Sequence, residues 1–521
     1  MPNVKSTKSP NSDGASLPSE MRDKLINYIR AGYPGLYLVS HEEQRVDGEM
    51  KAIAKQLKYN LAFWSVVDGL INATAKSASP AAQEPLEALI AIQELPEKSI
   101  ILLRDFHLFL IDPNPMLIRQ LKDVLQQAKT KNKTLIIMGC RLCLPPELER
   151  ELTVVEFALP DKEQLGHVLN GICESAQLEP VQGEQRETVL DAACGLTTIE
   201  AENAFALSVV ECKAISHTVV AREKAQAVKK NGLLEIIDAH ESLESIGGLD
   251  LLKDWLLQRR DAFSKRAMDY GLPTPKGLLI LGIPGTGKSL TAKATSKIFG
   301  MPLLKLDAGR IFGGLVGQSE SNLRSVIQTA EAIAPAVLWI DEIEKGFAGS
   351  KSSGATDGGT SSRVFGSFIS WMQEKTAPVF VVATANDVSQ LPPEMLRKGR
   401  FDELWYVDLP NQKEREAIWT IQITKHNRDP KDFDIIQLAR ATDGLTGSEI
   451  ENVFVDAMFK AFESDKEPTD LTVAQVLTEF VPLSKLMAEQ ITGLRNWVKG
   501  RARSATSPQP QEERRLRQIV A

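Results

Sequence analysis

The sequence contains few cysteines and no long apolar run. It has five cysteines in 521 residues, an odd number without framework spacing, and all five lie in the first half. This usage excludes a small secreted scaffold held by disulfides and indicates a reducing compartment. Apolar stretches such as Leu278–Leu281 and Val379–Ala383 are far shorter than the ~20 residues of a membrane-spanning helix. We therefore expect no transmembrane segment.

The sequence also lacks an excess of positive charge. Its 61 Lys and Arg residues against 68 Asp and Glu residues give a net charge of −7, which excludes a global field that would attract nucleic acid. Residues 1–20 are polar and lack the apolar core of a signal peptide, so we expect a cytoplasmic location. With 43% hydrophobic residues the chain should nevertheless fold, and its length suggests about three compact units.

One cysteine pair has a recognisable spacing. Cys140 and Cys143 are separated by two residues, as in redox and metal motifs, but the second pair that would complete a zinc site is missing. Buried thiols that pack as small apolar residues are the simpler interpretation.

Apolar runs separated by helix-length stretches indicate two series of alternating strands and helices. The first includes Gly35–Val39 and Ile100–Leu103, and the second includes Leu278–Leu281 and Val337–Ile340. A helical region follows each series, so the predicted fold class is α/β with parallel sheets. The predicted segments are a disordered lead (1–18), a first α/β domain (19–158), a helical segment (159–232), a second α/β domain (233–408), a second helical segment (409–498) and a flexible basic tail (499–521).

Short pieces of sequence recur in the same order in the two halves. They are Leu-Pro-Pro-Glu at 144 and 391, Leu-Pro at 159 and 409, and Gly-Leu-Thr at 195 and 444. The offsets are 247, 250 and 249 residues. Three collinear matches at nearly one offset predict a duplicated module, so the function depends on what each copy has kept.

The second copy contains a complete phosphate-binding loop. After the predicted strand Leu278–Leu281 come glycines, a lysine and a hydroxyl, and then a helix-compatible run. In this context the glycines let backbone N–H groups surround the α- and β-phosphates, while the lysine reaches the β- and γ-phosphates and the serine can ligate magnesium. A simple glycine turn would not account for the lysine and the serine. The candidate ATP-binding residues here are Gly282, Ile283, Pro284, Gly285, Thr286, Gly287, Lys288, Ser289 and Leu290, with Ser289 also a metal ligand.

Acidic and amide groups follow the next two strands. Asp341 and Glu342 come directly after Val337–Ile340. The first acid would hold Mg²⁺, and the second would orient and deprotonate the attacking water. Asn386 follows the strand Val379–Ala383, and its amide is a candidate sensor of the γ-phosphate.

A pair of arginines completes a pattern that resembles the AAA-type ATPases of the AAA+ class. Arg397 and Arg400 offer planar donors that suit phosphate charge, as arginine fingers do across a subunit boundary. The resemblance covers about residues 240–497 and includes Ser245-Ile-Gly-Gly248 and Gly444-Leu-Thr-Gly447-Ser448-Glu449. It implies an ATP hydrolase that uses ATP and Mg²⁺, has a helical lid, and assembles into a homo-oligomer, namely a hexameric ring. By the same resemblance the adenine would be bordered by Ile246, Gly247, Gly447 and Ser448, and Gly248 joins them as a cofactor-binding residue.

Two positions depart from the pattern of that family. Leu315 stands where unfolding members carry an aromatic pore-loop residue, and it offers less contact area. Vigorous unfolding of polypeptides is therefore not expected. Gln422 stands where many relatives have a histidine near the nucleotide, which would tune the affinity without abolishing it.

The first copy lacks the groups that bind nucleotide. Its counterpart of the phosphate loop, Val39–Arg45, has neither glycine nor lysine, and its two carboxylates would repel phosphate. The counterpart of the acidic strand end is Arg104-Asp105-Phe106-His107, which we expect to keep the first acid and to replace the second with phenylalanine. We therefore predict a degenerate AAA-like domain. A small metal or catalytic site at Asp105 and His107 is the alternative to a role in packing or partner binding.

Over nearly its whole length the chain resembles a family of AAA ATPases known from a conserved plastid open reading frame and its cyanobacterial and bacterial homologues, through motifs such as Arg30-Ala-Gly-Tyr-Pro34 and Arg501-Ala-Arg503. That resemblance implies a link to photosynthetic carbon use, and a location in the plastid stroma for a plastid-encoded protein. The expected function is magnesium-dependent ATP hydrolysis by a ring, coupled to remodelling of a protein or ribonucleoprotein partner. The alternatives are a nucleotide-gated scaffold and an ATPase that engages RNA or ribosomes through the basic tail.

Overall fold

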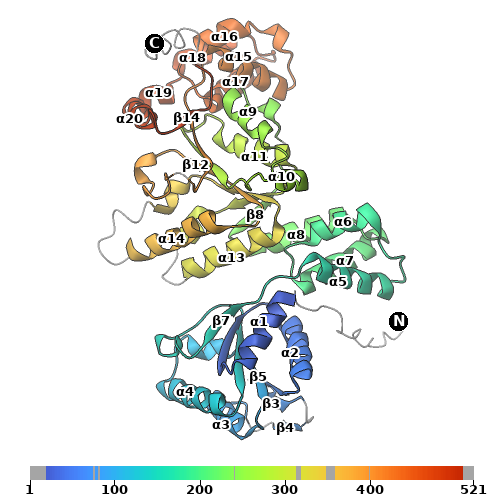
Figure 1. Cartoon of the computed structure of the whole chain (residues 1–521). Helices are drawn as coiled ribbons and strands as arrows, with labels where there is room; N and C mark the ends of the chain where they lie inside the picture. The colour runs from blue at the N-terminus through green and yellow to red at the C-terminus, as the bar shows by residue number, and fades with distance from the viewer. Residues whose placement is uncertain are drawn as a thin grey trace. The chain divides into compact units, whose positions relative to one another are not determined.

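The chain forms two compact units, which divide between Ala227 and Val228 (Figure 1). The computed structural model describes residues 19–73, 77–79, 82–230, 232–239, 241–312, 318–347, 358–397 and 399–508. The predicted lead (1–18), Leu315 of the predicted pore loop and the tail beyond residue 508 lie outside these ranges. None of the helices within them combines the length and the apolar character needed to cross a membrane.

The first unit contains an α/β domain followed by a group of helices. Its strands are β1 (Gly35–Val39), β2 (Asn60–Ser65), β3 (Gly69–Asn72), β4 (Ser77–Ser79), β5 (Ser99–Arg104), β6 (Thr134–Gly139) and β7 (Thr153–Glu156). Its helices are α1 (Ser19–Arg30), α2 (Glu43–Leu57), α3 (Pro85–Glu94), α4 (Pro115–Thr130), α5 (Lys162–Ser175), α6 (Gly183–Ala193), α7 (Thr198–Cys212) and α8 (His217–Lys230), with 3-10 turns η1 (Phe106–Leu110) and η2 (Pro146–Leu148).

Helices cover both faces of the first sheet (Figure 1). The strand order is β4-β3-β2-β5-β6-β1-β7, with a parallel centre and the antiparallel hairpin of β3 and β4 at one edge. On one face α1 and α2 pack through residues at helical spacing such as Val46, Met50 and Ile53, and on the other α3 and α4 pack on the opposite side chains of the same strands. Helices α5 to α8 enclose a separate small core.

The second unit repeats this plan with a larger set of elements. Its strands are β8 (Leu234–Ile237), β9 (Gly277–Gly282), β10 (Leu303–Leu306), β11 (Ala336–Ile340), β12 (Val379–Ala385), β13 (Glu403–Val407) and β14 (Arg503–Ser504). Its helices are α9 (Asp250–Gln258), α10 (Lys265–Tyr270), α11 (Lys288–Phe299), α12 (Ala308–Phe312), α13 (Gln318–Ile333), α14 (Gly358–Glu374), α15 (Gln412–Lys425), α16 (Ile435–Ala441), α17 (Gly447–Phe462), α18 (Asp470–Glu479), α19 (Leu483–Leu486) and α20 (Ala488–Val498). The 3-10 turns are η3 (Leu243–Ser245), η4 (Ile343–Phe347), η5 (Val388–Gln390) and η6 (Pro430–Asp432).

The two sheets share one topology, as a duplicated module requires. The second sheet has the order β14-β13-β9-β12-β11-β10-β8. Its five parallel strands are neighbours in the order β13, β9, β12, β11 and β10. The corresponding strands of the first sheet are β7, β1, β6, β5 and β2, and both sets occur in the same order along the chain. The carboxyl ends of β9, β11 and β12 therefore meet at one edge, which is where ligands bind in such sheets.

The parallel strands that the sequence predicts are flanked by antiparallel ones at the sheet edges. Strand β8 runs antiparallel to β10, β3 runs antiparallel to β2, and β4 runs antiparallel to β3. These strands are short, and their residues do not form a long apolar run, so the sequence pattern did not mark them.

The predicted flexible tail is packed against the second unit over its described part. Strand β14 extends the sheet beside β13. Ala505 is fully buried, and the backbone N–H of Ser507 donates to Asp250 Oδ1 at 2.9 Å. The charge of Arg503 did not prevent this packing, because its guanidinium lies over the Trp405 ring, 4.8 Å from the centroid.

Candidate functional site

The loop between β9 and α11 has the conformation that the glycine pattern predicts. Gly285 and Gly287 have φ values of 78° and 92°, which lie in the left-handed region that favours glycine. A Cβ at Gly285 would also lie only 2.9 Å from Thr446 Oγ1. Helix α11 begins at Lys288 directly after the loop, so its unpaired N–H groups and its positive end are available to a phosphate.

The Lys288 ammonium lies inside this loop. Its Nζ donates to the carbonyl oxygens of Gly282 and Ile283 at 3.0 and 2.7 Å, and the residue is only 7% exposed. Burial lowers the pKa of Lys288 to about 8, against the opposing effect of nearby carboxylates, of which Glu344 has the largest. The loop therefore holds a cation where the β- and γ-phosphates are expected.

Asp341 joins the phosphate loop to the neighbouring strands. Its Oδ1 accepts hydrogen bonds from Ser289 Oγ at 3.3 Å and from Thr384 Oγ1 at 2.7 Å. The two predicted metal ligands, Ser289 and Asp341, are thus brought together. Thr384 was not among the predicted site residues, although its place one residue after Ala383 at the end of an apolar strand was a usable signal.

Glu342 and Asn386 contact one another directly. Asn386 Nδ2 donates to Glu342 Oε1 at 2.9 Å. Glu342 has φ of 48°, an uncommon conformation for a residue with a side chain, and its backbone N–H donates to Thr384 Oγ1 at 3.0 Å. It also forms an ion pair with Lys345. The predicted base and the predicted sensor therefore form one hydrogen-bonded group.

Glu344 is a further acid of this site that the sequence analysis did not assign. It is 5% exposed, and its Oε1 accepts the backbone N–H of Asn386 at 2.9 Å. Burial raises the pKa of Glu344, and the hydrogen bond from Asn386 opposes that shift. Its spacing from Glu342 alone did not distinguish it from a solvated surface acid.

A cavity of about 270 Å³ connects these groups with the helical lid. Its lining includes Ile246 and Gly247 together with residues of α15 and the start of α17, among them Gln422. The predicted residues that line it are Ile246, Gly247, Pro284, Gly285, Thr286, Gly287, Lys288, Ser289, Leu290, Asp341, Glu342, Asn386, Gly447 and Ser448. Gly282, Ile283 and Gly248 are not among the residues that line it.

Gly248 has a packing role that the sequence analysis did not predict. With φ of 81°, it packs so closely on α15 that a Cβ would lie 2.2 Å from Glu414 Oε1. The same oxygen accepts hydrogen bonds from Leu249 N at 3.1 Å and from Thr506 Oγ1 at 2.7 Å. Glu414 therefore connects the segment around Gly248, the lid helix α15 and the residues that follow β14.

The two arginines do not lie in this cavity. Arg397 is exposed, and Arg400 donates to the backbone carbonyl of Glu394. Neither side chain lines the cavity. Their expected action on the nucleotide of a neighbouring subunit remains a prediction.

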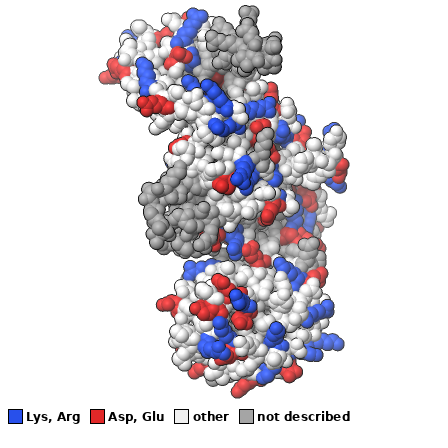
Figure 2. Space-filling model, turned by 60° about the vertical axis from the view of Figure 1, so that its left-hand side comes forward, with Lys and Arg blue, Asp and Glu red and all other residues white. Residues whose placement is uncertain are grey.

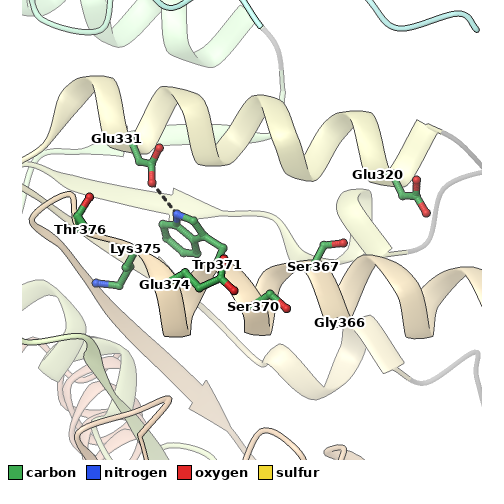
Figure 3. Close-up of a pocket in the computed structure, with 9 residues that line it drawn as sticks. All are labelled: Glu320, Glu331, Gly366, Ser367, Ser370, Trp371, Glu374, Lys375 and Thr376. Carbon is green, nitrogen blue, oxygen red and sulfur yellow. Dashed lines mark hydrogen bonds between the residues drawn. The ribbon is translucent and has the colours of Figure 1, made fainter. Parts of the chain in front are cut away.

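A larger hollow of about 750 Å³ lies between α13 and α14 (Figure 3). Trp371 crosses it and donates through Nε1 to Glu331 at 2.7 Å. The hollow contains none of the phosphate-loop residues, and Lys375 at its edge donates to the Val379 carbonyl. We place the functional site in the smaller cavity because the convergent polar groups lie there.

Comparison with known proteins identifies both units. The model described as "ATPase family associated with various cellular activities (AAA)" matches residues 278–409, and the AAA+ lid domain model matches 432–473. The N-terminal domain and the second domain of SpoVK-like AAA ATPases match 21–157 and 163–231. The AAA domain-containing protein ycf46 of Trieres chinensis is 40% identical over 496 residues, which cover 94% of this chain and 99% of that protein.

The chain belongs to the AAA ATPase family. The ycf46 protein of Pyropia yezoensis is 38% identical over 92% of this ATPase and 98% of its own length. The ATP-dependent zinc metalloprotease FtsH of Mycoplasmoides gallisepticum is 32% identical over 44% of this chain and 30% of its own length. The AAA domain establishes ATP binding and ATP hydrolysis as the activity of the chain.

In the first copy of this ATPase, an ion pair fills the place of the phosphate loop. Glu42 and Arg45 pair with side chains only 4% and 2% exposed. Glu42 Oε1 also accepts the Thr198 backbone N–H at 2.6 Å, and Arg45 donates to the Ala158 carbonyl. The carboxylate of Glu42, which was expected to repel phosphate, is buried and paired with Arg45. It also connects the loop after β1 to helix α7 of the same unit.

The expected alignment of the acidic strand end was wrong by one residue in this ATPase. Asp105 has φ of 53° and precedes η1, just as Glu342 has φ of 48° and precedes η4. Asp105 therefore corresponds to Glu342, and Arg104 corresponds to Asp341. Arg104 pairs with Glu43 and Asp47, so a cation stands where the ATPase copy has its expected magnesium ligand.

Proposed function

We propose that the second unit hydrolyses magnesium-bound ATP within an assembly of several copies, and that the first unit holds a protein or ribonucleoprotein partner that this hydrolysis remodels. The observation that carries the proposal is the contrast between the two copies. One has a cavity in which a cation, acids and an amide converge, and the other has the Glu42–Arg45 pair in that place. A copy that cannot turn over nucleotide is free to serve binding.

The donor set of the second copy suits ATP with Mg²⁺. The Ser289 hydroxyl and the Asp341 carboxylate, 3.3 Å apart, are hard oxygen ligands of the kind magnesium prefers. They would hold the ion, which would offset phosphate charge. Lys288 and the amides at the start of α11 would hold the β- and γ-phosphates, and the left-handed glycines leave room for them.

Glu342 is the proposed base for the attacking water. The amide of Asn386 holds its Oε1, which fixes the direction of the carboxylate. Glu344 in turn accepts the backbone N–H of Asn386 and so positions the sensor rather than contacting the substrate. Water bound between Glu342 and the γ-phosphate would lose its proton to the carboxylate as the bond to phosphorus forms.

Substituting Glu342→Gln tests this assignment. The amide keeps the size of the side chain and cannot take a proton, so ATP should bind and turnover should fall by about 10²-fold or more. Gel filtration followed by analysis of the retained nucleotide should find ATP rather than ADP. Unchanged turnover would remove Glu342 from this role. Glu331→Gln, at the hollow between α13 and α14, is the matched control and should turn over normally.

Arg397 and Arg400 lie outside the cavity of their own chain, which supports a role for them at the nucleotide of a neighbour. AAA ATPases are typically oligomeric, and we propose a ring that is a hexamer. Subunits carrying Arg397→Ala and Arg400→Ala should bind ATP and, when mixed with wild-type subunits, should lower turnover per wild-type site. Turnover that falls only in proportion to dilution would contradict fingers acting in trans.

A nucleotide-gated scaffold is the second candidate, favoured by the aliphatic Leu315 where an unfolding ring would carry an aromatic residue. The two candidates differ in their need for repeated turnover. A remodeller in the Glu342→Gln form should retain its partner, whereas the wild-type form with ATP should release it in altered form. A scaffold should hold its partner equally in both forms while ATP is bound.

Engagement of RNA through the basic tail receives less support. Arg501 lies over the Trp497 ring and Arg503 over the Trp405 ring, so these two cations contact their own chain. Figure 2 shows positive and negative side chains interspersed over the visible face rather than one continuous basic area. Stimulation of ATP turnover by RNA that is lost with added salt would restore this candidate.

A further inference from the structure

In the degenerate copy, a thiol stands at the position of Asn386 in the ATPase copy, and an imidazole stands at the position of Glu344. Cys140 Sγ lies 3.6 Å from His107 Nε2. Cys140 directly follows β6 as Asn386 follows β12, and His107 stands two residues after the left-handed Asp105 as Glu344 does after Glu342. Over the ranges that the structure describes, no three His, Cys, Asp or Glu side chains are grouped to hold a metal ion. The pair therefore points to thiol chemistry.

The imidazole of His107 is built into the domain. It is 1% exposed, and its Nδ1 has no hydrogen-bond partner, with Asp105 Oδ1 at 3.8 Å. A Cβ at Gly139 would lie 2.6 Å from the ring, so the absence of a side chain there makes room for it. Burial lowers the pKa of His107, against the charge of Asp105. The neutral tautomer that carries its proton on Nδ1 would direct the lone pair of Nε2 at the thiol.

The turn that contains Cys140 and Cys143 is held in place by a side chain of the sheet. The fully buried Tyr37 donates its hydroxyl to the Arg141 carbonyl at 2.6 Å and accepts the backbone N–H of Cys143 at 3.0 Å. Cys140 is exposed, so the interpretation as a buried apolar thiol was wrong for it, whereas Cys143 is partly exposed and packs against the core of the domain. An oxidant can reach the turn from solvent.

We propose that Cys140 and Cys143 form a redox-active dithiol that peroxides oxidise with the help of His107. The Cys140 thiol gives its proton to His107 Nε2, and the thiolate attacks one oxygen of hydrogen peroxide. The O–O bond breaks, the departing hydroxide takes the proton from the imidazolium as water, and Cys140 becomes a sulfenic acid. The Cys143 thiol then attacks the Cys140 sulfur, the S–O bond breaks, and the departing hydroxide takes the Cys143 proton and leaves as a second water. In total, two thiols and one peroxide give one disulfide and two waters.

The full-length chain provides its own control, because Cys212 is also exposed and lies on α7 outside this turn. Reduced protein is pulsed with iodoacetamide, and the labelling of each cysteine is followed by mass spectrometry. Cys140 should react about tenfold or more faster than Cys212, because its thiolate is formed with help from the histidine. After treatment with hydrogen peroxide, the peptides of Cys140 and Cys143 should be linked by a disulfide.

Two variants separate the roles of the groups. His107→Gln should slow the labelling of Cys140 to the rate of Cys212. The Cys143→Ser variant keeps the buried imidazole of His107. Its oxidation should stop at the Cys140 sulfenic acid, which dimedone captures. ATP turnover by Cys143→Ser should be unchanged and the amides of β1 should keep their protection against hydrogen exchange, which shows that both units are folded. Equal labelling of Cys140 and Cys212 in the wild-type chain, or oxidation without a Cys140–Cys143 link, would overturn the proposal.

Discussion

Removing the Glu42 carboxylate should destabilise the first unit strongly. In the Glu42→Ala variant the guanidinium of Arg45, 2% exposed, stays buried without its partner, which typically costs about 3–5 kcal/mol. The Thr198 N–H also loses its acceptor, which costs about 1 kcal/mol more. The Ala158 carbonyl still accepts from Arg45 and offsets part of this. We expect a loss of about 4 kcal/mol in the free energy of unfolding of this unit.

Hydrogen exchange on the full-length chain measures this loss region by region. The most protected amides of β1 should exchange about a thousandfold faster in Glu42→Ala, because each 1.4 kcal/mol is about a factor of ten. The amides of β9 in the second unit should not change and serve as the internal control. A double variant with Glu42→Met and Arg45→Leu should recover most of the protection, because an apolar pair leaves no buried charge. A loss below about 1 kcal/mol in the single variant, or no recovery in the double variant, would refute the reasoning.

Two further predictions concern the nucleotide site. Because the pKa of Lys288 is lowered to about 8, its charge is lost as the pH rises through 8, and ATP affinity should be about tenfold weaker at pH 9 than at pH 7. Fluorescent-nucleotide titration checks this, and a wild-type affinity that stays the same between pH 7 and pH 9 would contradict it. Gly248→Val should weaken ATP binding about tenfold by displacing Glu414 and the lid. Gly271→Val, with φ of 87° but open space around it, is the matched control, and equal losses in both variants would point to backbone strain alone.

The phosphate loop and the acidic strand end could be predicted from the sequence because their chemistry is local. Glycines, Lys288 and Ser289 between an apolar run and a helix form a combination that is typical of phosphate binding, and Asp341 follows a buried strand. The structure places these groups around one cavity. Their catalytic roles stay predictions until the variants are measured.

The contacts that cross the chain could not be predicted in this way. Glu414 meets Gly248 and Thr506 across separations of 166 and 92 residues, and the burial of Glu42 depends on helices that follow it by more than a hundred residues. The offset between the two copies also changes from element to element, so the predicted correspondence of Asp105 with Asp341 was wrong by one position. The left-handed residue after each strand settled that alignment.

The stoichiometry of bound nucleotide tests the central claim most directly. Equilibrium dialysis of the Glu342→Gln variant with labelled ATP and Mg²⁺ should reach no more than one ATP per chain at saturation, and adding Lys288→Ala should abolish that binding. Two ATP molecules per chain, or binding that survives the loss of Lys288, would place a nucleotide in the first copy and contradict the account.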